Sequence, residues 1–286
     1  MNKFHDKIIF FLYFIFLTVG IYIFKDFGLG LEESFQRASG FYWLTYITDL
    51  LNLESLKTIS ENKYKELYSL NQNLPRVINN PAYGIILDVP VALLEIFLDF
   101  DKNINNINLK HFLIFFTFFL STIFFGKLIK KRYSNFYVTF FGLIVYFFSP
   151  KIFGASFFDG KDLFFLSIFT ITIYFFQNFL NKNTFISLLL FAAFSAFSTS
   201  SRIFGLFIPL SFILMIIFKL LCDIEIKKNI KILSIYISSY VIFLFLHWPY
   251  LWNLSSHKIK LSGANIKVFF DGNYYDNLAL PLSYIP

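Results

Sequence analysis

Acidic and basic side chains gather in short segments of an otherwise apolar chain, and these segments could carry chemistry. DFGLGLEESFQRASG holds two adjacent glutamates, SPKIFGASFFDGKD alternates lysines with aspartates, and STSSR ends in an arginine. Cationic groups can hold a phosphate, and a nearby carboxylate can act as general base toward a hydroxyl or amine. With the aspartate of YGIILDVP added, the candidate site residues are Glu32, Glu33, Gln36, Arg37, Asp88, Lys151, Asp159, Lys161, Asp162 and Arg202.

Each of these residues also has an ordinary structural interpretation. Adjacent glutamates outside a membrane helix are usually solvated surface, and a lysine beside a span, such as Lys151, is usually an interfacial anchor. Asp159 and Asp162 could pair with Lys161 or cap a helix that begins at Leu163. The four histidines show no metal-ligand spacing, so a zinc site is not expected.

The elements that must position these residues are predicted to be membrane helices. The chain is 57% hydrophobic and 15% charged, whereas soluble domains carry about 25% charged residues. We therefore predict an all-α fold, a polytopic transmembrane bundle of about seven spans that forms a single domain over residues 1–286. The apolar runs are residues 8–24, 112–129, 137–148, 163–180, 184–199, 203–221 and 232–246.

The basic residues predict the orientation of the chain in the membrane. Short segments on one side hold most of them, and the positive-inside rule makes that side cytoplasmic, with the N-terminus. The outer segments are then 25–111, 149–162 and 248–286, and the first is long enough to carry interfacial helices in GFYWLTYITDLLNL and VPVALLEIFLDF. Topology accounts for the net charge of +7, so nucleic acid is not an expected partner. The inner basic residues are Lys3, Lys7, Lys127, Lys130, Lys131, Arg132, Lys182, Lys219, Lys227, Lys228 and Lys231.

The polar segments, in this order and on this side, resemble the C-type glycosyltransferases (GT-C), closest to the protein-mannosyltransferase-like and aminoarabinose-transferase-like group of family 39. DFGLGLEESFQRASG and AYGIILDVPVALLE resemble that group's first outer loop, SPKIFGASFFDGKDLFFLS its second, and SSRIFGL the start of a span. WPYLW and GNYYDNLALPLSYIP resemble the outer segment after the seventh span.

The chain departs from the family pattern at two residues. Where the family usually has Asp this chain has Glu32, and Lys151 stands where Arg is expected. Family members continue through several more spans, so this chain is expected to be truncated relative to them.

The resemblance implies an inverting transfer of a hexose or pentose from a polyprenyl-phosphate carrier. The acceptor would be a protein, lipid or glycan at the outer face of a bacterial inner membrane. Glu32 would act as general base or orient the acceptor, and Glu33 would support it or help to bind a divalent cation, the one cofactor left open. The residues that would face the carrier phosphate are Lys151, Lys161 and Arg202.

Two other functions remain open at this stage. A membrane transporter or flippase would also use several spans, but transporters usually place charges or broken helices near the bilayer midplane. In this sequence the predicted spans are nearly free of charge, which favours chemistry at the interface. The third possibility is an inactive, truncated membrane component.

Overall fold

A computed structural model describes residues 3–30, 32–70, 84–98, 103–222 and 224–252, and this part of the chain is helical without a strand. The predicted all-α class is therefore confirmed for these residues. The helices are α1 (Lys3–Ile23), η1 (Phe24–Asp26), α2 (Glu33–Leu50), α3 (Glu54–Leu70), α4 (Asp88–Leu98), α5 (Asn103–Tyr133), α6 (Phe136–Phe148), α7 (Pro150–Ala155), α8 (Asp162–Lys182), α9 (Phe185–Ser201), η3 (Ile203–Leu206), α10 (Phe207–Leu221), α11 (Ile226–His247) and η4 (Pro249–Trp252).

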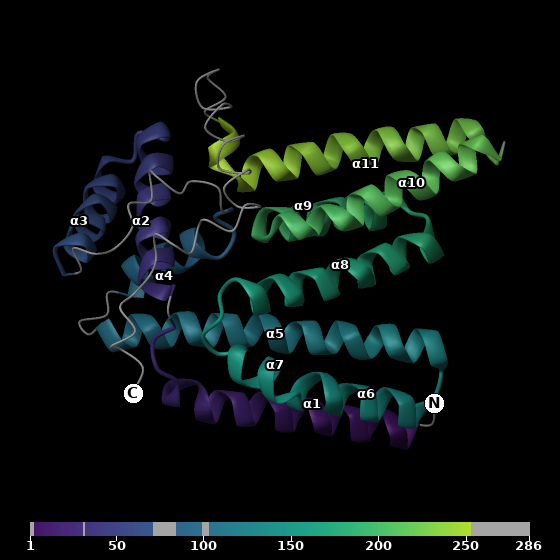
Figure 1. The fold of residues 1–286 in the computed structure, drawn as a ribbon, viewed down its shortest axis with the longest axis horizontal. Coiled ribbons are helices and arrows are strands. Elements are labelled where there is room, and N and C mark those ends of the chain that lie inside the picture. The colour runs from purple at the N-terminus through teal and green to yellow at the C-terminus, as the bar shows by residue number, and fades with distance from the viewer. Residues whose placement is uncertain (1–2, 31, 71–83, 99–102, 223, 253–286) are drawn as a thin grey trace, which may run out of the picture.

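Long apolar helices lie side by side and alternate in direction along the chain (Figure 1). Among the described residues, five helical segments are long and apolar enough to cross a membrane, as expected of an integral membrane protein. All seven predicted apolar runs lie in helices apart from Thr184, the N-cap of α9, but α6 and α9 are shorter than those five. With its 13 residues α6 is only about 20 Å long, less than the roughly 30 Å of a hydrocarbon core. The five longer segments are Lys3–Asp26, Asn105–Tyr133, Asp162–Lys182, Ile203–Leu221 and Ile226–His247.

Aromatic side chains form the core between these helices. Phe16 of α1 stacks on Phe147 of α6 with ring centroids 3.9 Å apart, and Phe115 of α5 stacks on Phe157 at 5.2 Å. On the far side of α8, a second cluster joins α9, α10 and α11. Large apolar side chains also remain exposed, as on a surface that faces lipid. Examples are Phe10, Phe14, Tyr22, Phe141, Leu214 and Val241.

Local sequence signals set several helix ends. The side chain of Asn135 accepts from the backbone of Tyr137 at 2.8 Å and so caps α6, and Thr184 with Ser187 forms a capping box at the start of α9. Pro209 lies in the first turn of α10, just after η3, where the helix needs fewer backbone donors.

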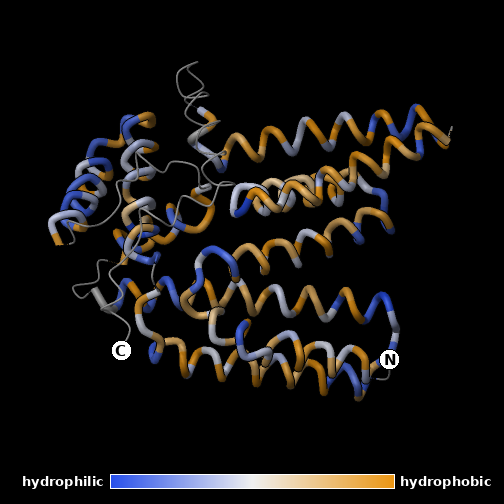
Figure 2. The backbone as a smooth tube through the Cα atoms, viewed as in Figure 1, coloured by the Kyte–Doolittle hydropathy of each residue, from blue (hydrophilic) through white to orange (hydrophobic). Residues whose placement is uncertain are grey.

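Helices α2, α3 and α4 gather at one end of the bundle, where α1 and α11 end and α5 begins (Figure 1). They lie within the predicted first outer segment, and α2 packs against both α3 and α4. Hydrophilic residues concentrate at the two ends of the long helices, with hydrophobic residues between them (Figure 2). Residues 253–286, most of the predicted outer C-terminal segment, lie outside the described residues.

Candidate functional site

Polar side chains converge at the end of the bundle that carries α2, α3 and α4. They come from helices α2, α4, α5 and α8, from the loop before α8 and from the residues that cap α2 and α9, and most are buried or half-buried. We call this set the polar cluster. Its members are Glu32, Glu33, Gln36, Arg37, Asp88, Glu95, Lys110, His111, Lys161, Asp162 and Arg202.

The loop before α8 supplies one edge of the polar cluster. The carboxylate of Asp159 accepts from the backbone N–H of Lys161 at 3.0 Å and of Asp162 at 2.8 Å, so Asp159 shapes the loop and the start of α8. This geometry leaves the ammonium of Lys161 2.5 Å from the carboxylate of Glu32. Asp162 pairs with Arg202, which lies at the end of α9. Ion pairs thus connect α2, α8 and α9.

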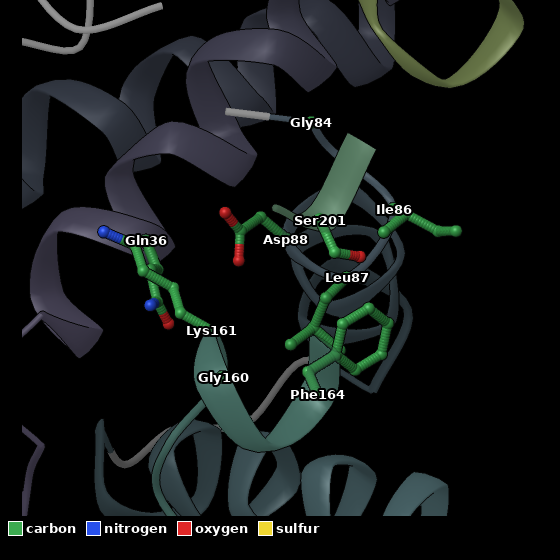
Figure 3. Close-up of a pocket in the computed structure, with 9 residues that line it drawn as sticks. All are labelled: Gln36, Gly84, Ile86, Leu87, Asp88, Gly160, Lys161, Phe164 and Ser201. Atoms are coloured by element: carbon green, nitrogen blue, oxygen red, sulfur yellow. The ribbon is translucent and has the colours of Figure 1, made fainter. Parts of the chain in front are cut away.

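Asp88 lies in a small cleft that also contacts Gln36, Lys161 and Ser201 (Figure 3). The cleft holds about 30 Å³, which is enough for ordered water. The carboxylate points toward the side of the cleft where Gln36 and Lys161 lie. Burial raises the pKa of Asp88 to about 6, while Lys110 and Lys161 act in the opposite direction. The cleft therefore holds a carboxyl group that titrates close to neutral pH.

A glycine brings Asp88 to this position. The N–H of Gly84 donates to the carbonyl oxygen of Ser200 at 3.0 Å, and a Cβ on Gly84 would lie 2.5 Å from that oxygen. Only glycine lets the backbone lie this close to the end of α9. The segment then runs directly into α4, whose first residue is Asp88.

Lys110 is a buried cation on α5, and only 5% of its surface is exposed. Its ammonium donates to the side-chain oxygen of Gln36. Asp88 and Glu33 supply the nearby negative charge. A buried ammonium is stable only with such partners, so Lys110 ties α5 to α2 and to the Asp88 cleft.

Glu33 binds a different partner from Glu32. Nε2 of His111 lies 2.9 Å from Oε1 and 3.2 Å from Oε2 of Glu33, with hydrogen-bond geometry toward Oε2. The same Oε2 accepts from the backbone N–H of Gly30 at 2.7 Å, and both side chains are buried. The two adjacent glutamates therefore do not form one carboxylate pair.

Arg37 and Glu95 form a fork-shaped ion pair between α2 and α4. Nε of Arg37 donates to both carboxylate oxygens of Glu95, at 3.1 and 3.0 Å, and an Nη atom adds a further contact. Glu95 is 4% exposed, so this charge is neutralised inside the protein. Arg37, Glu95, Glu33 and Lys110 also border a cavity of about 190 Å³ that is larger than the Asp88 cleft.

The structure gathers most of the predicted site residues but leaves one apart. Lys151 is exposed on α7, and no contact with the described members of the polar cluster is recorded. Asp159 acts on backbone amides, which is the structural interpretation considered for it from the sequence. The roles of the other residues in binding or catalysis stay predictions.

Sequence reasoning missed three members of the polar cluster, Glu95, Lys110 and His111. Glu95 stands four residues after Val91 and three after Ala92, on the buried face of an apolar helix, and a single acid in that position signals a buried partner. Lys110 and His111 adjoin the apolar run of α5, which places two polar residues at the bundle end of a span. The positions of Glu95, Lys110 and His111 within or beside apolar helical segments could therefore have identified them as site residues from the sequence.

Among the described residues, no three histidine, cysteine, aspartate or glutamate side chains form a group that could hold a metal ion. Comparison with known proteins finds no matching family model, no matching curated protein and no matching solved structure.

Proposed function

We propose that this protein is a membrane glycosyltransferase that moves a sugar from a polyprenyl-phosphate carrier to an acceptor at the outer face of a bacterial inner membrane. The observation that carries the proposal is the polar cluster, in which Lys110, Lys161 and Arg202 lie beside carboxylates at one end of an apolar bundle. That end would sit at the membrane interface, where the phosphate of a lipid carrier is found.

In this reaction the acceptor oxygen attacks the anomeric carbon from the face opposite the phosphate. The bond between that carbon and the phosphate oxygen breaks, its electron pair stays on the phosphate, and the configuration inverts. Lys161 and Arg202 would stabilise the departing phosphate, because cations act strongly where charge develops away from bulk water. Glu32 would take the acceptor proton as general base.

The geometry refines which carboxylates could act. Glu32 is half-exposed beside Lys161, so a substrate can reach it, whereas Glu33 is buried against His111. Glu32 therefore remains the first candidate for the base and Glu33 the better candidate for a supporting role. Asp88, with its pKa near 6 and its place in the cleft, is a second carboxyl group that could exchange a proton near neutral pH.

Transport of a lipid-linked or small polar substrate is the competing function, and an inactive membrane component is the third. The polar cluster lies at the end of the bundle, where Figure 2 shows hydrophilic residues, and not between its apolar middle sections. Transporters bind their substrates near the midplane, so this distribution supports interfacial chemistry.

The test supplies labelled polyprenyl-phosphate sugars to membranes that contain the protein and measures which label leaves the carrier. We expect transfer, and we expect Glu32→Gln to lower its rate by at least about 100-fold, the range for loss of a general base. The amount of protein in the membrane should not change.

Glu54→Gln is the matched control, because it makes the same change at an exposed glutamate on the neighbouring helix α3. It should leave transfer intact. Full activity of Glu32→Gln would remove Glu32 from the mechanism. Uptake or flipping without any sugar transfer would establish the transporter instead.

A further inference from the structure

The cavity of about 190 Å³ lies between α2, α3, α4 and α5, next to the Asp88 cleft. Gln36 borders the cleft, Lys110 borders the cavity, and the hydrogen bond between them forms part of the shared wall. Five of its lining residues are aliphatic, namely Leu29, Leu67, Leu70, Val91 and Ile107. The two spaces therefore differ: the cleft is small and polar, and the cavity is larger with one aliphatic side.

The charges that border the cavity cancel one another. Glu33 contacts His111, Arg37 is paired with Glu95, and the ammonium of Lys110 donates to Gln36. With two carboxylates and two cations around it, the cavity has no surplus positive charge for a phosphate or carboxylate ligand. An anion placed there would lose its hydration and gain little in return.

The cavity does offer a hydrogen-bond acceptor that nothing in the described structure uses. Asn106 borders it with 4% of its surface exposed, and its Oδ1 atom has no partner among the described residues. A buried acceptor without a donor is unfavourable, so a ligand that brings a hydroxyl or N–H group gains by filling this place. In size the cavity exceeds the roughly 150 Å³ that admits a six-membered carbon ring.

We propose that this cavity binds the uncharged, hydroxyl-bearing head group of an amphiphile, separately from the Asp88 cleft. Its hydroxyl groups would donate to Asn106 and to the carboxylate of Glu33, and its carbon face would lie against the aliphatic lining. The identification of this ligand as the sugar acceptor rests on the proposed function. The binding itself does not, so the two can be tested apart.

The test is calorimetric titration of the full chain in lipid nanodiscs, with empty nanodiscs as the baseline. The probe is n-hexyl β-D-glucoside, and n-hexyl phosphate has the same chain with an anionic head group. We expect saturable binding of the glucoside at one site per chain and at least tenfold weaker binding of the phosphate. No sugar transfer enters this measurement, so an inactive protein that binds the glucoside would contradict the proposed function alone.

Two variants locate the binding site. Asn106→Leu removes the free acceptor, and Leu67→Phe fills the cavity from α3 and leaves Asn106 in place. Each should weaken glucoside binding by about tenfold or more, because Asn106→Leu removes a buried hydrogen bond and Leu67→Phe takes up the space that the sugar ring needs. Asn105→Leu makes the same change at an exposed neighbour and should have no effect. Absence of saturable binding, equal binding of the phosphate, or unchanged binding by both cavity variants would overturn the proposal.

Discussion

At the scale of single residues, Asp88 shows how position changes the chemistry of an ordinary side chain. Its carboxyl group stands at the first residue of α4, where a negative charge usually helps a helix. Lys110 and Lys161 also favour the charged form, yet burial outweighs them and raises the pKa of Asp88 to about 6. The ionised carboxylate is therefore less stable in the folded protein than in water.

Because burial disfavours the charged form of Asp88, the stability of the folded protein depends on pH. The pKa of Asp88 is higher in the folded than in the unfolded chain, so folding favours the protonated form. The stabilising effect is complete below the ordinary pKa of 3.8 and is lost as the pH rises through about 6. We expect Asp88→Asn to be more stable than the parent at pH 7.5, by about 1–3 kcal/mol.

Thermal unfolding in detergent, followed by circular dichroism between pH 4 and pH 8, checks this. The difference in Tm between variant and parent should be largest at pH 7.5 and should shrink toward pH 4. Asp26→Asn, at an exposed position, serves as control and should show no such trend. A variant less stable than the parent at pH 7.5 would contradict the assignment.

The sequence predicts well which residues lie at the site. It predicts less well which side chains they contact there. The order of apolar runs places Glu32, Asp88 and Arg202 on one side of the membrane, and the structure brings them to one end of the bundle. It could not predict that Glu32 and Glu33 face different partners. Those partners, His111 of α5 and Lys161 before α8, come from segments far apart from Glu32 and Glu33 in the chain, and only the folded structure brings them together.

At the scale of elements, the crossing of α2 and α4 holds much of the polar cluster in place. The two helices meet at Gly40, where a Cβ would lie 2.4 Å from the carbonyl oxygen of Asp88 and 3.2 Å from Cβ of Ala92. Arg37, one turn earlier in α2, reaches Glu95 of α4. Close backbone contact and the ion pair thus set the position of α4 together.

Gly40→Ala should therefore destabilise the protein, although alanine is the better helix former. The nearest atom is backbone at the start of α4, so α4 must shift, and overpacking of this kind costs about 1–3 kcal/mol. Thermal unfolding should show a lower Tm. Gly154→Ala, in α7 with no atom within 4 Å of the new Cβ, should keep or raise the Tm. Equal behaviour of the two variants would show that the α2–α4 contact is looser than the structure has it.

At the scale of the whole molecule, the two ends of the bundle carry different kinds of charge. The end that carries the polar cluster holds cations paired with acids, such as Lys161 with Glu32 and Arg202 with Asp162. The opposite end, where α5, α8 and α10 finish, holds the basic residues of their last turns. The apolar runs and this charge asymmetry were predictable from the sequence, because both follow from the preferences of residues in a bilayer, but the helix ends were not: α5 begins at Asn103, before the predicted run of 112–129. The arrangement of α2, α3 and α4 around the cavity was not, because no membrane constraint fixes it.

The asymmetry predicts that the polar cluster faces the exterior, and the single cysteine gives a direct test. Cys222 is exposed just after α10, at the end opposite the polar cluster, so it should lie on the cytoplasmic side. In sealed right-side-out vesicles, a membrane-impermeant maleimide should leave Cys222 unlabelled until the membrane is permeabilised. In a Cys222→Ser background, Glu54→Cys should be labelled at once, because Glu54 is exposed on α3, which lies at the other end. In the same background, Lys131→Cys, near the end of α5, should behave like Cys222. The reverse pattern would place the polar cluster in the cytoplasm, where a carrier that presents its sugar outside could not reach it.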